Sequence, residues 1–150
     1  HWRIKEPDID ADWFIVNFRD GVYNGGFVGA SQDGAEALQW WARCCEFACE
    51  KDYRRGLFDD QKYLDLMPAA FPNVKILQHR GCNVAFWNAH ENIRSIEQGQ
   101  VMINDTYPVV FVHFTDDLVK QIEKGYEPEL KQLRQYHLAN NFKQNEAQWQ

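Results

Sequence analysis

The sequence predicts a mixed α/β fold, in which a mixed sheet is flanked by helices. Apolar residues recur at helical spacing between Ala37 and Ala48. Residues 107–114 form a nearly continuous apolar run, which is typical of a strand buried on both faces. From Asp116 onward the apolar spacing is helical again. The resulting order of elements differs from the regular βαβ alternation of a complete doubly wound domain.

The first thirty residues contain few signals of regular structure. Residues 1–20 are polar and rich in turn-forming residues, and we expect an extended segment there. Residues 21–30 read as a β run that Asn24-Gly25-Gly26 interrupts. The interruption fits a hairpin turn, and it fits equally a place where backbone must approach a ligand.

Two helices are expected next. An N-cap at Ser31 or Asp33 begins the first, which should run to about Lys51 and pack on a sheet. Asp59 is placed to cap a second, short helix, which Pro68 and Pro72 should end.

The remaining elements are short. We expect strands at residues 74–77, 84–87 and 101–103, a loop at 93–99 and a turn at 104–105. Two amphipathic helical segments should follow, one around residues 118–122 and one from residue 130.

Composition limits the functional classes. The 150 residues fit one domain, and 45 % of them are hydrophobic, which is enough for a core. The net charge is −6 and the basic residues are scattered, so the positive stripe of a nucleic-acid-binding protein is missing. Aromatic residues make up 15 %; they fill cores, and they also line sugar sites.

The cysteines and the apolar runs indicate a cytoplasmic protein. None of the four cysteines belongs to a paired C-x-x-C arrangement, so reduced and mostly buried thiols are the simplest account. No run is long enough for a membrane span, and no signal peptide is visible. The chain begins with His1 rather than Met, and we interpret it as an excised fragment or a processed chain.

Asp60 and Gln61 are the first candidates for chemistry. A carboxylate beside an amide can both accept and donate hydrogen bonds, which is what sugar hydroxyls require. The more common role of such residues is helix capping, with Asp59 and Asp60 complementing the helix dipole. Both roles can coexist if Asp59 caps the helix and Asp60 faces a cleft.

His113 is the second candidate, because it closes the apolar run where strand becomes loop. Ligands gather beyond the carboxyl ends of strands in α/β sheets, and a neutral imidazole there can bind a divalent metal. A lone histidine is more often hydrogen-bonded to backbone at a strand end.

Two further groups offer polar contacts to a substrate. The small residues of Asn24-Gly25-Gly26 would let backbone N–H groups and an amide reach a ligand, although a bulge or turn is the more common explanation. The second group has two amides and an indole that suit sugar binding, or else a turn followed by core packing: Asn83, Trp87 and Asn88. The chain has no G-x-S-x-G, P-loop or G-x-G-x-x-G motif.

Five segments lie in order along residues 21–115: G-V-Y-N-G-G-F-V-G, W-W, F-D-D-Q-K-Y-L-D-L, G-C-N-V-A-F-W-N and F-V-H-F-T. Taken together, they resemble the C-terminal half of bacterial glycosyltransferases of the GT-A type. Each motif alone is weak, whereas their combination is fairly specific.

The resemblance implies roles for several residues. GT-A enzymes use a nucleotide-diphosphate sugar and a divalent cation, manganese or magnesium. By this resemblance, Asp60 and Gln61 contact the transferred sugar, with Asp60 as the catalytic carboxylate, and His113 completes the metal shell. The substrate-binding residues that the resemblance implies are Asn24, Gly25, Gly26 and Gln61, and the amides and indole of Asn83, Trp87 and Asn88 add three more candidates.

The chain departs from the family pattern in two places. Asp8-Ile9-Asp10 has the letters of the metal-binding D-x-D motif but no strand before it, and Asp116 follows Thr115 where the family has glycine. We therefore expect residues 1–150 to be a single domain that keeps the sugar and acceptor side, lacks the nucleotide-binding half, and is inactive alone.

The leading hypothesis is transfer of a sugar from a nucleotide-diphosphate donor to a glycan or other acceptor. The alternative is a non-catalytic carbohydrate-binding or interaction module, which needs no metal; a third is a structural subdomain. We expect no nucleic-acid partner and no membrane span. The expected location is the cytoplasm, with association at the inner face of the membrane left open, and an unpaired sheet edge would favour a homodimer of the fragment.

Overall fold

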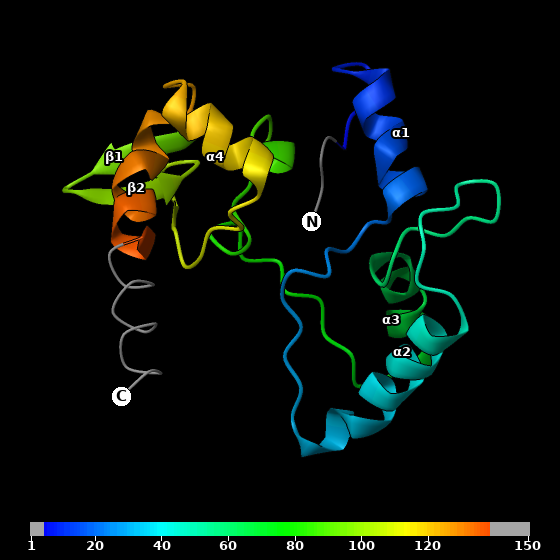
Figure 1. Cartoon of the computed structure of the whole chain (residues 1–150). Helices are drawn as coiled ribbons and strands as arrows, with labels where there is room; N and C mark the ends of the chain where they lie inside the picture. The colour runs from blue at the N-terminus through cyan, green and yellow to red at the C-terminus, as the bar shows by residue number, and fades with distance from the viewer. Residues whose placement is uncertain (1–4, 139–150) are drawn as a thin grey trace, which may run out of the picture.

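The computed structural model describes residues 5–138 and has a mixed α/β architecture (Figure 1). The α-helices are α1 (Ala11–Asp20), α2 (Ala35–Phe47), α3 (Met67–Ala70) and α4 (Asp116–Glu123). The strands are β1 (Arg94–Glu97), β2 (Gln100–Ile103) and β3 (Tyr107–Pro108). Short 3-10 helices are η1 (Gln32–Gly34), η2 (Gln61–Asp65), η3 (Phe86–Asn88) and η4 (Pro128–Leu130), and residues 131–138 are helical. The predicted class, mixed α/β with flanking helices, is confirmed at this coarse level.

The sheet is antiparallel, in the order β1-β2-β3. Gln98 and Gly99 both have positive φ and form the tight turn between β1 and β2, where glycine avoids steric strain. The loop predicted for residues 93–99 is therefore wrong for residues 94–97, which form β1 and pair with β2. The predicted strand at 101–103 and the turn at 104–105 are confirmed.

The apolar run at residues 107–114 forms much less strand than predicted. Only Tyr107 and Pro108 join the sheet. Val109 N–H still donates to the Val101 carbonyl of β2 at 3.0 Å, but Val110 N–H donates instead to the Gly81 carbonyl of a turn, at 2.7 Å. Val84 and Val112 then form an isolated parallel bridge, which is all that the predicted strand at 84–87 contributes. A Cβ at Gly81 would overlap the carbonyl of Pro108, so the two segments cross where only glycine fits.

The larger core lies between the sheet and the C-terminal helices. Its buried residues are Val84, Val101, Ile103, Leu118, Ile122 and Leu130. The helix α4 begins at a proper cap, because the Thr115 hydroxyl accepts a hydrogen bond from Leu118 N–H at 3.3 Å. The predicted helix around residues 118–122 is confirmed, and the one expected from residue 130 is present as far as residue 138.

A smaller core holds α2, η2 and α3 together. It consists of Ala37, Leu64 and Met67, against which aromatic rings of the neighbouring segments pack. The predicted first helix is confirmed but ends at Phe47, before Lys51. The second helix was predicted to end at Pro68 and Pro72. Pro68 instead lies in the first turn of α3, where its missing N–H costs nothing, whereas the end before Pro72 is confirmed, because α3 stops at Ala70.

The extended conformation predicted for residues 1–20 is wrong for α1. The Asp10 carboxylate caps this helix by accepting from Trp13 N–H at 2.9 Å, and Gly21 ends it with φ +104°. Within residues 5–138, none of the helices combines the length and the apolar character that a membrane crossing requires.

Two extended segments, residues 22–31 and 72–83, run between the two cores (Figure 1). The strands predicted within residues 21–30 and at 74–77 are not formed. The alternating pattern of 74–77 is present in the sequence, yet this segment has no strand partner in the part of the chain that the structure describes. These segments instead form the walls of the candidate site.

Candidate functional site

Gln61 anchors the first of the extended segments. Its side chain is 8 % exposed, and its Nε2 donates to the Asp20 carbonyl at 2.9 Å, at the end of α1. Its Oε1 accepts from Asn24 Nδ2 at 2.9 Å and from Gly25 N–H at 3.3 Å. The Asn-Gly-Gly segment is therefore held against the start of η2 by one buried amide.

Asp65 fixes the beginning of the same segment. Its Oδ1 accepts from Val22 N–H at 2.8 Å, while its Oδ2 lies 2.9 Å from Lys62 Nζ. A Cβ at Gly21 would lie 3.3 Å from Asp65 Oδ1, so the chain passes close to this carboxylate. The sequence analysis missed Asp65, which lies at the opposite end of η2 from Gln61.

Asp60 lies at the N-terminus of η2 but does not cap it. Its backbone carbonyl accepts from Trp41 Nε1 at 2.8 Å, which ties the segment to α2. Its carboxylate faces Gly25, where a Cβ would lie 3.5 Å from Oδ2. Asp59 also makes no capping bond and lies 3.2 Å from Lys51 Nζ. The capping interpretation is thus wrong for both residues, and within residues 5–138 no hydrogen bond or ion pair engages the Asp60 carboxylate.

Asn24 links the anchored segment to the second wall. Its Oδ1 accepts from Gly26 N–H at 2.9 Å and from Asn83 Nδ2 at 3.1 Å. Asn83 has φ +59°, a left-handed conformation that asparagine tolerates, in the turn after Gly81. Five residues predicted from three separate motifs therefore form one continuous network of side-chain and backbone hydrogen bonds: Asn24, Gly25, Gly26, Gln61 and Asn83.

His113 joins this network at its far end. Its Nδ1 lies 3.1 Å from Asn83 Oδ1, and its ring meets the Trp87 ring edge-on with centroids 5.0 Å apart. Burial lowers the pKa of His113 below its usual value, so the imidazole is neutral at neutral pH.

Trp87 and Asn88 make internal contacts in this structure. Trp87 is only 6 % exposed and packs against the rings of Phe86 and His113. Asn88 is 4 % exposed; it accepts from Ala85 N–H at 3.1 Å and donates to the Asn83 carbonyl at 2.9 Å. Both residues support the turn that presents Asn83, and their direct contact with a substrate stays a prediction.

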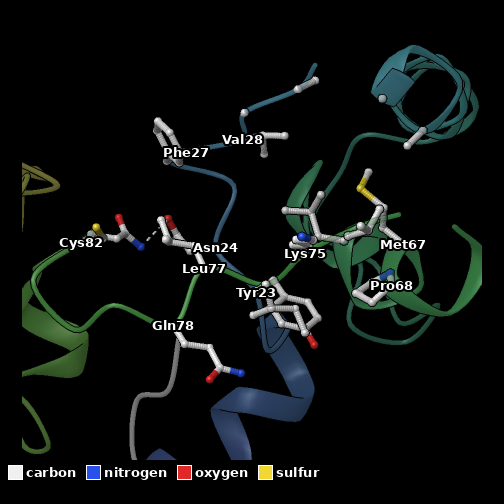
Figure 2. Close-up of a pocket in the computed structure, with 18 of the residues that line it drawn as sticks. Tyr23, Asn24, Phe27, Val28, Met67, Pro68, Lys75, Leu77, Gln78 and Cys82 are labelled. Atoms are coloured by element: carbon white, nitrogen blue, oxygen red, sulfur yellow. Dashed lines mark hydrogen bonds between the residues drawn. The ribbon is translucent and has the colours of Figure 1, made fainter. Parts of the chain in front are cut away.

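A cleft of about 1190 Å³ lies beside the network, between the extended segments and the smaller core (Figure 2). Asn24, Asn83 and Asn88 line it, whereas Asp60, Gln61 and His113 do not. The close-up shows Phe27 and Val28 on one wall, Met67 and Pro68 on another, and Leu77 and Gln78 on the segment that passes beneath (Figure 2).

The sequence analysis missed most of this lining. Phe27 is 57 % exposed, Ile76 42 % and Leu77 55 %, although all three are apolar and the last two were predicted in a strand. Unpaired apolar segments beside amide groups are typical of ligand clefts. One signal was available in the sequence. The short apolar run at residues 74–77 follows two prolines, Pro68 and Pro72, and prolines interrupt regular structure.

A metal centre is only partly provided by the residues that the structure describes. Between residues 5 and 138 no three His, Cys, Asp or Glu side chains cluster in a way that could hold an ion. His113 could supply one ligand through Nε2, because Nδ1 is engaged by Asn83. The donor set therefore does not fit a metal without further ligands, and His113 as a metal ligand stays a prediction.

Comparison with known proteins gives relatives without a known activity. The chain is 33 % identical over 117 residues to the uncharacterized protein YfnF of Bacillus subtilis (strain 168), an alignment that covers 77 % of this chain and 37 % of YfnF. It is 37 % identical over 101 residues to the uncharacterized protein YfnD of the same strain, covering 65 % of this chain and 32 % of YfnD. The chain thus spans about a third of the length of these relatives. No family model matches it, and no solved structure matches it.

Proposed function

We propose that this chain is the sugar- and acceptor-side part of a glycosyltransferase that uses a nucleotide-diphosphate sugar. The observation that carries the proposal is the position of the Asp60 carboxylate against Gly25, beside the amide network of Gln61, Asn24 and Asn83. A carboxylate that no other residue between 5 and 138 engages in a hydrogen bond or ion pair, next to ordered amides and near an open cleft, suits the hydrogen bonding of a sugar.

In the proposed reaction the bond between the anomeric carbon and the diphosphate breaks, and a bond to an acceptor oxygen forms. Asp60 accepts hydrogen bonds from the donor sugar and holds it in line, so that proximity supplies much of the rate. If the configuration is inverted, Asp60 also takes the proton of the acceptor hydroxyl. A bound manganese or magnesium ion would neutralise charge on the leaving diphosphate, with His113 as one of its ligands.

The cleft of about 1190 Å³ is the proposed acceptor site. It adjoins the network through Asn24 and Asn83, and its exposed rings and aliphatic side chains suit the apolar faces of a glycan. We propose the cytoplasm as the compartment, because all four cysteines are free. The homodimer expected from an unpaired sheet edge stays a prediction, which the mass of the full-length protein in solution tests.

The experiment is a screen of nucleotide sugars for manganese-dependent release of nucleotide by the full-length protein. Asp60→Asn is the test variant and Asp59→Asn the matched control, because the two residues are adjacent and, within the described residues 5–138, Asp59 is ion-paired and Asp60 is not. We expect release with one donor, loss of release without metal, loss in Asp60→Asn, and little change in Asp59→Asn.

A carbohydrate-binding module is the second candidate. The lack of a three-residue metal cluster between residues 5 and 138 favours it, since sugar binding through amides and rings needs no metal. It predicts no nucleotide release with any donor but metal-independent glycan binding, which Asn24→Ala should weaken. Such a result with folded protein would replace the enzyme proposal.

A further inference from the structure

In the amide network, the hydrogen-bond partners fix which end of each side-chain amide is the donating nitrogen and which is the accepting oxygen. This order of donors and acceptors, the direction of the network, begins at Gln61. A backbone carbonyl can only accept a hydrogen bond and a backbone N–H can only donate one. Gln61 faces the Asp20 carbonyl with one end and Gly25 N–H with the other. Its amide nitrogen must therefore point to Asp20, and its oxygen must point to Gly25 and Asn24.

The direction passes to Asn24 in the same way. Gly26 N–H lies 2.9 Å from the Asn24 side chain and can only donate, so the Asn24 oxygen must be on that side. The Asn24 nitrogen then faces Gln61 Oε1 and donates a hydrogen bond to this oxygen at 2.9 Å. Two backbone donors and one backbone acceptor thus agree on the orientation of both amides, with no choice left open.

Asn83 carries the direction to the imidazole. The Asn24 oxygen accepts from Asn83 across 3.1 Å, so the Asn83 nitrogen faces Asn24 and the Asn83 oxygen faces His113 Nδ1. An amide oxygen only accepts, and the hydrogen of this contact must therefore reside on Nδ1.

We propose that Gln61, Asn24 and Asn83 are positioning residues that hold His113 as its Nδ1–H tautomer and leave the lone pair on Nε2 for a ligand. The ring has little freedom to escape this arrangement. Gly26 lies directly against Cε1 and Nδ1, and Trp87 contacts the ring from another side.

The identity of the ligand on Nε2 rests on the proposed function, in which it is the divalent cation. The tautomer of His113 is inferred from the hydrogen bonds alone and does not depend on that function. An imidazole without an oriented partner favours a proton on Nε2 in water, the opposite of what the network dictates. The three amides, far apart in the sequence at residues 24, 61 and 83, therefore act together through a single proton.

The test is a long-range nitrogen–proton correlation spectrum of the full-length protein labelled with 15N-histidine, recorded at neutral pH without added metal. It shows which ring nitrogen carries the proton, and His113→Gln identifies the signals of His113. We expect Nδ1 to be protonated and Nε2 bare. Asn83→Leu and Asn24→Ala should each lose this pattern and shift His113 towards the Nε2–H form.

Asn83→Asp is the conservative variant, since it keeps an oxygen opposite Nδ1 and should keep a proton there. Asn73→Ala is the matched control, because Asn73 is an exposed asparagine of the same cleft without a bond to the network. A proton on Nε2 in the unsubstituted protein would overturn the proposal, as would an unchanged spectrum in folded Asn24→Ala.

The nucleotide-release screen is run on the same preparation and separates the two proposals. An Nδ1–H tautomer that depends on Asn83, together with no release from any donor, would sustain the network and remove the glycosyltransferase. Nucleotide release by a protein whose His113 carries its proton on Nε2 would support the glycosyltransferase proposal and overturn the proposed role of the network.

Discussion

Gly26 lies directly against the imidazole ring of His113, at a point where any side chain would occupy the same space. A Cβ there would overlap Cε1 and Nδ1 of the ring and would also lie 2.7 Å from Asn24 Oδ1. The ring cannot easily retreat, because Asn83 and Trp87 hold it on other sides. Glycine at this position is therefore a requirement of the network rather than of the backbone conformation.

Gly26→Ala should consequently displace His113 from Asn83. Overpacking of this kind costs about 1–3 kcal/mol in the free energy of unfolding. We expect a lower urea midpoint and, in the proposed enzyme, loss of nucleotide release. Gly29→Ala is the matched control, because a Cβ at Gly29 makes only an ordinary contact of 3.8 Å with Phe27. Equal stability and activity of the two variants would contradict the packing argument.

The lowered pKa of His113 predicts a specific dependence of stability on pH. The folded pKa is below the usual 6.5, so the unfolded chain binds the proton more readily. The contribution of His113 to stability is therefore fully present above pH 6.5 and is lost as the pH falls through the folded pKa. We expect the urea midpoint to decrease from pH 7.5 to pH 5.

His113→Gln should show a smaller decrease over the same range, because glutamine has no proton to gain. His90→Gln serves as the control, since His90 is an exposed histidine, whereas His113 is part of the amide network. A pH dependence that is unchanged by His113→Gln would show that other groups cause it.

Local signals predicted the elements that their own residues stabilise. The helix α2, the helix α4 with its Thr115 cap, and the strand β2 all follow from spacing and capping within a few residues. The helix α1 carried such a signal as well, because Asp10 caps it through Trp13 N–H, but the surrounding Pro7 and acidic residues suggested turns.

The failed strand predictions have a different cause. Residues 74–77 and 110–114 have strand-like composition, yet whether such a segment joins a sheet depends on a partner that is distant in sequence. Val110 and Phe111 both donate to the Gly81 carbonyl, and this contact across about thirty residues takes the place of a ladder. The sequence pattern of residues 110–114 alone does not predict a contact with Gly81.

The site shows the same division. Motifs identified the polar residues Asn24, Gln61, Asn83 and His113, and the structure brings them into one network. The direction of that network depends on Asp20 and on backbone groups, which no side-chain pattern reveals. The apolar lining of the cleft was missed because it, too, depends on contacts between segments that are distant in sequence.

Trp41 should stabilise the position of Asp60 through one hydrogen bond. Its indole Nε1 donates to the Asp60 carbonyl at 2.8 Å, between α2 and the start of η2. Trp41→Phe keeps an aromatic ring but removes the donor, which costs about 0.5–1.5 kcal/mol in the free energy of unfolding. We expect this loss in urea denaturation, with reduced nucleotide release if Asp60 acts on the sugar.

Trp40→Phe is the matched control for this prediction. Trp40 is the neighbouring tryptophan, and it meets Phe71 edge-on at 5.5 Å rather than holding a backbone carbonyl. A Trp40→Phe variant with a reduction in nucleotide release as large as that of Trp41→Phe would mean that ring packing, not the bond to Asp60, matters.

The buried ion pair between Arg94 and Glu127 should be dispensable only as a pair. Arg94 Nη1 lies 3.1 Å from Glu127 Oε2, and the two side chains are 6 % and 7 % exposed. Arg94 Nη2 also donates to the Ala85 carbonyl at 2.9 Å, but Arg94 Nε is buried without a partner in the described part of the chain. Burial raises the pKa of Glu127 and lowers that of Arg94, so desolvation outweighs their attraction.

Arg94→Met alone, or Glu127→Leu alone, leaves one charge buried without its partner and should cost about 3–5 kcal/mol in the free energy of unfolding. The double variant removes both charges and replaces them with apolar side chains of similar volume. We expect its urea midpoint to lie near or above that of the unsubstituted protein, because no desolvated charge remains. A double variant no more stable than the weaker single variant would show that the bond from Arg94 to Ala85, which supports the turn before Trp87, is what the fold requires.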